Sequence, residues 1–267
     1  MSLKATILGC GSSGGVPRVG GDWGYCNPNE PKNRRSRCSL LVEKTGPEGT
    51  TTVLVDTSPD LREQLLKAEV KRLDAVVYTH DHADQTHGID DLRAIAYRMR
   101  SQIPVYMDAH TETHVVDRFR YCFEMPEGRV HPAILSLQPL IKDEQTISIE
   151  GPGGTIEIQI IEASHGPTPT LILLFDDQLA YGPDVWDIPQ EGLARLSGVD
   201  SWICDALRYS DHPTHAHVDR ALSWLANAQV KQGILTNLHI DLDYNELQAE
   251  LPAFVAPAYD GMVIELT

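Results

Sequence analysis

The stretch 78–87 concentrates side chains that can bind a metal ion. It contains imidazoles at His80 and His82 and a carboxylate at Asp84. Imidazole and carboxylate are common ligands of divalent ions such as zinc and manganese. A bound ion of this kind lowers the pKa of water to about 7. The stretch therefore predicts a metal site with hydrolytic chemistry at neutral pH.

The local pattern indicates where this stretch lies in the fold. An apolar, β-branched run leads into it at 75–78, and a helical pattern follows after Gly88. This order predicts a buried strand, a loop and then a helix. The apolar positions of the helical pattern are Ile89, Leu92, Ile95 and Met99. We expect the three ligands to converge from an irregular loop at the end of the strand.

Further candidate ligands stand directly after other predicted strands. His165 and Asp184 each follow a short predicted strand, and His239 follows the strand predicted over 233–236. Ligand sites of layered α/β proteins gather at the ends of strands. We therefore expect the fold to bring these side chains together with the stretch 78–87.

Composition and charge limit the classes of partner. The chain has 267 residues, 42% of them hydrophobic, and a formal net charge of −16. Its length and composition predict one globular domain over residues 1–267. The acidic charge disfavours binding to nucleic acid polymers and anionic membranes, and no stretch reaches the ~18 apolar residues of a transmembrane helix. The five cysteines form no paired motif, which is typical of a cytoplasmic protein.

A glycine motif near the N-terminus bears on nucleotide binding. Residues 9–14 match GxGxxG directly after a predicted strand, as in dinucleotide-binding turns. Pro17, Gly20 and Gly21 oppose the helix that should follow and hold a pyrophosphate. We therefore do not expect a dinucleotide-binding domain, and the loop forms either an anion-binding nest or a tight turn.

The spacing His80-x-His82-x-Asp84 resembles the first part of the HxHxDH signature of the metallo-β-lactamase superfamily. Gln85 stands where that motif has its last histidine. The later spacing of His165 is similar to that of the superfamily's third histidine. Within the superfamily, the cyclic phosphoribosyl phosphodiesterases are similar at residues 9–17, 37–39 and 258–262. The resemblance implies an α+β fold, a four-layer αββα sandwich with its metal site at one edge.

The resemblance also implies which residues hold the metal ions. His80, His82 and His165 would bind the first ion. Asp184 matches the bridging aspartate, and Asp84 would bind a second ion.

Two residues are candidates for the last ligand of the second ion. Direct alignment places Asn237 there, whereas a shift of two residues places His239, which we favour. The cofactor is expected to be one or two divalent ions, zinc or manganese. Because Gln85 supplies no imidazole, the second ion should bind more weakly and prefer manganese.

Catalytic and substrate-binding roles follow from the same resemblance. His215 matches the general acid and stands before a helix predicted over 217–228. Asp84 is the expected proton acceptor, and His212 joins His215 as an expected substrate-binding residue.

These roles predict a metal-dependent phosphodiesterase that acts on a small phosphate ester, of the nucleotide or phosphoribosyl cyclic phosphate type. A thioester or lactone hydrolase is one alternative, and a tRNA-end endonuclease, which the charge of −16 disfavours, is another. A third is a non-catalytic module that binds nucleotide phosphates and has lost its second metal site. The expected partner is a small phosphorylated compound, and a homodimer is left open.

Overall fold

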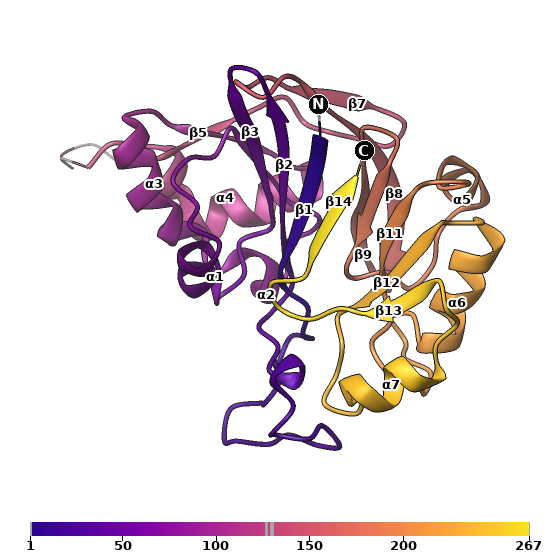
Figure 1. Ribbon diagram of the computed structural model, residues 1–267. Coiled ribbons are helices and arrows are strands. Elements are labelled where there is room, and N and C mark those ends of the chain that lie inside the picture. The colour runs from indigo at the N-terminus through magenta and orange to yellow at the C-terminus, as the bar shows by residue number, and fades with distance from the viewer. Residues whose placement is uncertain (1, 126–127, 129–130, 267) are drawn as a thin grey trace.

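Two β-sheets lie face to face in the computed structural model, which describes residues 2–125, 128 and 131–266 (Figure 1). The first sheet has the order β14 (Val263–Leu266), β1 (Ser2–Gly9), β2 (Ser39–Gly46), β3 (Gly49–Val55), β4 (Ala75–Val77), β5 (Ile103–Tyr106), β6 (Leu135–Leu137). The second has the order β13 (Val255–Pro257), β12 (Gln232–Thr236), β11 (Ser201–Asp205), β10 (Leu179–Gly182), β9 (Thr168–Phe175), β8 (Ile156–His165), β7 (Thr146–Ile149).

Both sheets follow the same pairing scheme. From β14 to β3 the neighbouring strands are antiparallel, and from β3 to β6 they are parallel. From β7 to β10 the strands are again antiparallel, and from β10 to β13 they are parallel. Parallel neighbours end at a common edge, so the segments after β3 and β4, and those after β10, β11 and β12, are gathered at sheet edges.

Helices cover the outer face of each sheet. The first sheet carries α1 (Leu61–Lys67), α3 (Leu92–Met99) and α4 (Ala109–Phe123), and the second carries α5 (Gln190–Arg195), α6 (Val218–Asn227) and α7 (Tyr244–Glu250) (Figure 1). Short helices α2 (Ala83–Thr86), η1 (Pro31–Asn33) and η2 (Ile89–Asp91) lie in the connections. No helix in the described part of the chain has the length and apolarity to cross a membrane.

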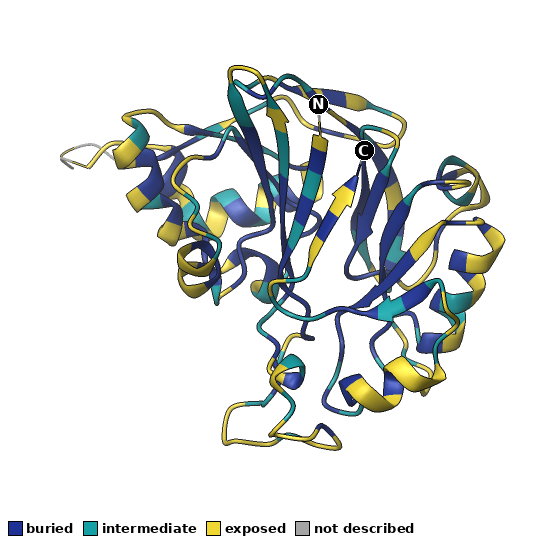
Figure 2. Cartoon of the chain, viewed as in Figure 1, coloured by how far each residue is buried: buried dark blue, intermediate teal, exposed yellow. Residues whose placement is uncertain are grey.

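Successive side chains of a strand point to opposite faces of its sheet, which explains the arrangement of sheets and helices in layers. In β2, Leu40 and Val42 point into the core between the sheets, whereas Leu41 packs with the helices outside. In β8, Ile160 faces the core between the sheets, and Ile161 packs under the helices of the second sheet. Central strands such as β4, β10 and β11 are therefore buried on both faces, and the helices are exposed on their outer sides (Figure 2). This confirms the four-layer αββα sandwich.

The stretch 78–87 differs from its prediction in one respect. His80 lies between β4 and α2 as expected, but α2 begins at Ala83, directly after His82, and places Asp84 in its first turn. The expectation that all three ligands lie in an irregular loop is therefore wrong for Asp84. The helix expected after Gly88 is confirmed as η2 followed by α3.

Candidate metal centre

Three imidazoles from two sheets converge at the edge of the sandwich. The ring centroids of His80 and His82 lie 4.6 Å apart, those of His80 and His165 5.2 Å, and those of His82 and His165 4.9 Å. One donor atom from each ring falls within 4.8 Å of the others. Burial lowers the pKa of His80, and it lowers that of His165 to about 3, with the neighbouring histidines adding to both shifts. Both rings are therefore neutral, which is the form that binds a metal.

A chain of hydrogen bonds orients His80. The backbone N–H of Thr79 donates to Asp56 Oδ1 at 2.8 Å, and its hydroxyl donates to Asp56 Oδ2 at 2.9 Å. The same hydroxyl oxygen lies 3.0 Å from His80 Nδ1 and accepts a hydrogen bond from its N–H. His80 Nε2 is then unprotonated, and it is buried without a hydrogen-bond partner among the described residues. An orphaned acceptor of this kind, inside a cluster of imidazoles, fits a metal ligand.

Thr79→Val is expected to weaken divalent ion binding by ~10–100-fold, because the hydroxyl that joins Asp56 to His80 is lost while the shape is kept. Calorimetric titration with Zn²⁺ measures the change. The exposed Thr113, on α4, provides the matched control: Thr113→Val should bind the ion as the unmodified protein does. Equal affinity in both variants would show that the hydroxyl does not orient His80.

The rings of His165 and His82 also contact polar groups outside the cluster. His165 Nδ1 donates to the backbone carbonyl of Thr214 at 2.6 Å, which leaves its Nε2 free. His82 Nε2 lies 3.4 Å from the hydroxyl of Thr168, at the start of β9. Such outer contacts fix the tautomer and direction of a ligating ring.

Asp184 lies beside this cluster, two residues after the end of β10. It is buried and falls in a second group of donor atoms with His165 and His215, again within 4.8 Å. Burial raises its pKa well above the usual range, and a bound cation would act in the opposite direction. Its Oδ2 accepts from Gln85 Nε2 at 3.0 Å, and its Oδ1 lies 3.4 Å from Asn237 Nδ2.

His215 is paired with a carboxylate that the sequence analysis gave no role. Its Nδ1 lies 2.8 Å from Oδ2 of the buried Asp205, the last residue of β11. Burial would lower the pKa of His215, but the carboxylates of Asp205 and then Asp184 outweigh it and raise the pKa to about 9. The ring is therefore protonated at neutral pH. Asp205 and Asp56 each stand at the end of an apolar strand, as the predicted ligands do. The sequence pattern that identified those ligands therefore also applies to these two residues.

His239 does not join the cluster. Its Nε2 contacts the guanidinium of Arg18, and its Nδ1 lies 2.9 Å from Asp241 Oδ2. The direct alignment, and not the shifted one that we favoured, gives the residue that faces the centre. That residue is Asn237, whose positive φ of 61° turns the chain immediately after β12.

Two further predicted residues lie next to the cluster without entering either group of donors. Asp84 is half-buried, and its charge contributes to the raised pKa of Asp184 and of His215. The ring of His212 lies 4.9 Å, centroid to centroid, from that of His215.

A pocket opens at His215. It has a volume of about 380 Å³ and combines an indole, several imidazoles and a guanidinium. Its lining residues are Trp186, Asp211, His212, Pro213, His215, His217 and Arg220. Its size lies within the range of small-molecule sites.

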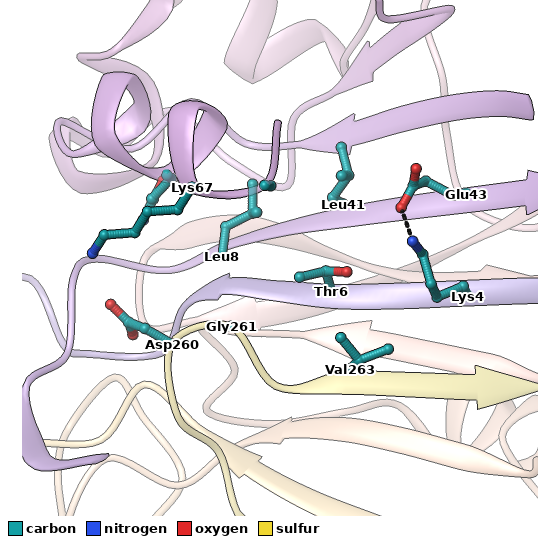
Figure 3. A pocket seen from close by; sticks show the side chains of 11 residues that line it. Lys4, Thr6, Leu8, Leu41, Glu43, Lys67, Asp260, Gly261 and Val263 are labelled. Atoms are coloured by element: carbon teal, nitrogen blue, oxygen red, sulfur yellow. Dashed lines mark ion pairs between the residues drawn. The ribbon is translucent and has the colours of Figure 1, made fainter. Parts of the chain in front are cut away.

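A different pocket, of about 320 Å³, lies over β1, β2 and α1 (Figure 3). Its polar groups include Lys67, Asp260 and an ion pair of Lys4 with Glu43 at 2.7 Å (Figure 3). It is lined by none of the histidines of the cluster, so it has no part in the chemistry described above.

Comparison with known proteins agrees with the geometry of the centre. Residues 51–240 match the family model of the β-lactamase superfamily domain. The crystal structure of a diphosphatase from the PhnP family superposes with a TM-score of 0.88 at 32% identity, over 99% of this chain and 98% of that one. The chain belongs to the PhnP family of the metallo-β-lactamase superfamily.

Two other proteins place this PhnP-family chain in a wider context. PqqB from Methylobacterium extorquens, solved with Zn²⁺ bound, superposes with a TM-score of 0.73 at 18% identity, over 98% of this chain and 100% of PqqB. A protein of Porphyromonas gingivalis named octanoyltransferase is 28% identical over 263 residues, which are 97% of this chain and 51% of that protein. The chain thus spans about half the length of this curated relative.

The superfamily implies a divalent metal ion, and the residues of this chain fit one such ion. His80, with its orphaned Nε2, would hold the ion together with His82, His165 and Asp184. The chain therefore has the metallo-β-lactamase fold, and its donor set is one that can hold a divalent ion.

Proposed function

We propose that this protein is a phosphodiesterase that hydrolyses a small phosphate ester. The observation that carries the proposal is the protonated His215–Asp205 pair beside the imidazole cluster. A metal centre and a positioned acid are the two parts that hydrolysis of a phosphodiester with a poor leaving group needs. The PhnP-family protein that this chain resembles is named a diphosphatase, which supports a phosphorylated substrate.

The roles of the residues follow from their contacts. When bound, a divalent ion supplies Lewis acidity and a lower pKa for water. His215 points Nδ1–H at Asp205, which leaves Nε2–H to donate to the departing oxygen of the substrate. Asp84, half-buried at the start of α2, accepts a proton from the attacking water.

The pocket at His215 supports a small and anionic substrate. His212, His217 and Arg220 add positive or protonatable groups to it, and Trp186 is 37% exposed. Side chains of these types bind phosphate oxygens and planar groups, as in a nucleotide or a phosphoribosyl compound. The net charge of −16 argues against a nucleic acid polymer as substrate.

Acyl chemistry is the second candidate, because the curated relative from Porphyromonas gingivalis is named an octanoyltransferase. A thioester hydrolase would use the same metal centre on a carbonyl carbon. The five cysteines are buried and unpaired, which supports a reducing, cytoplasmic setting for either activity.

A substrate panel separates these candidates. Purified protein loaded with Zn²⁺ or Mn²⁺ is assayed on bis(p-nitrophenyl) phosphate, a ribose cyclic phosphate, a nucleoside diphosphate derivative, an octanoyl thioester and a short RNA. We expect turnover on the small phosphate compounds, and none on the thioester or the RNA. His80→Ala should lose this turnover. Faster turnover of the thioester than of every phosphate ester would replace the proposal with acyl hydrolysis. Binding of nucleotides without any turnover would leave a non-catalytic module.

A further inference from the structure

Each carboxylate oxygen of Asp184 accepts a hydrogen bond from a side-chain amide. Gln85 Nε2 lies 3.0 Å from Oδ2, and Asn237 Nδ2 lies 3.4 Å from Oδ1. Asn237 Nδ2 also lies 3.1 Å from Asp205 Oδ1. With a cation bound beside it, the carboxylate of Asp184 is ionised and only accepts hydrogen bonds, so the NH₂ end of each amide faces it. An amide NH₂ group offers a proton and not an electron pair, so neither nitrogen can ligate a metal here.

We propose that this centre holds a single divalent ion on its three imidazoles and Asp184, and that Gln85 and Asn237 stand in for a second ion. Each amide donates a hydrogen bond to a carboxylate oxygen that a second cation would otherwise neutralise. The inference rests on the proposed function only in taking the imidazole cluster as a metal site. It requires no particular substrate.

The donors left for a second ion are few. Asp84 is the carboxylate that the superfamily signature gives to the second ion, and its charge is one of those felt at Asp184. His239 is held by Arg18 and Asp241 instead. Transition ions bind weakly to a site that has lost its imidazoles. Gln85 Oε1 is buried without a partner in the described structure. It would accept a hydrogen bond from a water molecule in the centre, which satisfies the remaining end of the amide.

A separate group of donors must be removed before ions are counted. Asp81 lies 3.6 Å from His110 Nε2 and 3.6 Å from His114 Nδ1, and these three residues could hold an ion of their own near the surface. The stoichiometry is therefore measured in a His110→Ala/His114→Ala background. Arg118 still pairs with Asp81 there, at 2.9 Å, so its charge stays compensated.

The experiment counts bound ions by calorimetric titration and native mass spectrometry, with Zn²⁺ and separately with Mn²⁺. We expect one ion per chain in the background protein, and two ions after Gln85→His and Asn237→His are combined in it. Two ions per chain in the background protein would overturn the proposal, and if the second were only Mn²⁺, Gln85 Oε1 would be its ligand. No bound ion at all would remove the metal centre, and the proposed function with it.

A second measurement covers the case in which the double variant does not fold. The electron paramagnetic resonance spectrum of the background protein saturated with Mn²⁺ should be that of an isolated ion. An exchange-coupled spectrum would show two neighbouring ions and contradict the proposal. A single ion in the folded double variant would show that the amides do not decide the count, which also contradicts it. Turnover enters neither readout, so a wrong substrate class cannot imitate either result.

Discussion

His80→Ala is expected to leave the protein without a tightly bound ion and without turnover. His80 contributes a buried nitrogen that has no hydrogen-bond partner in the described structure, and Asp56 and Thr79 fix its direction. Loss of the ligand should cost more than the ~10–100-fold in affinity that loss of a supporting hydrogen bond costs. Elemental analysis after dialysis and calorimetric titration with Zn²⁺ measure the effect.

His87→Ala is the matched control for this change, because His87 belongs to the same stretch but is exposed and packs on Phe119 at 5.6 Å between ring centroids. It should keep both the ion and the turnover. Thermal unfolding adds a readout independent of activity. A chelator should lower the melting temperature of the His87 variant, because bound ions stabilise the folded state, and should have little effect on the His80 variant. A His80 variant with full ion content would remove the assignment.

His215→Ala is expected to lower turnover by ~10²–10⁴-fold on a phosphodiester whose leaving group is an alkoxide. On a p-nitrophenyl ester the loss should be far smaller, because p-nitrophenolate departs without a proton. The ratio of the two losses therefore reports proton donation. Equal losses on both substrates would mean that His215 binds phosphate or only packs against His165, whose ring centroid lies 4.4 Å away.

Asp205 acts through His215 and provides a second test of the same role. In Asp205→Asn the carboxylate that holds the pKa of His215 at about 9 is replaced by a neutral group. The alkaline limb of the pH profile, where His215 loses its proton, should then move to lower pH. A structural role alone would lower the rate without moving that limb.

Much of the fold and part of the centre could be predicted from the sequence, because strand ends carry a local signal. An apolar run followed by a polar ligand identifies His80 and Asp184. They follow β4 in the first sheet and β10 in the second, and the packing of the two sheets brings these strand ends together. The same rule applied to every strand would also have found Asp56 and Asp205. The pairing of Asp205 with His215 could not be predicted, since it depends on where the chain between β11 and α6 turns back.

The choice between Asn237 and His239 could not be made from residue type and local sequence pattern. Both lie just after β12, and residue type alone favours the imidazole. The backbone decides otherwise, because Asn237 adopts a left-handed conformation and directs its amide at Asp184. Asparagine tolerates this conformation better than most residues. Asp56, after β3, has the same feature with a φ of 60°, so two of the residues that orient this site adopt that conformation.

The shared carboxylate of Asp184 also constrains how this family member can change over evolution. Gln85 lies in α2 and Asn237 after β12, yet both amides contact one side chain. Residues that share a partner have non-additive mutational effects. A single replacement at either position leaves Asp184 with mismatched neighbours, so the two positions should vary together among relatives. The effect of exchanging one amide for histidine should therefore depend on which residue stands at the other position.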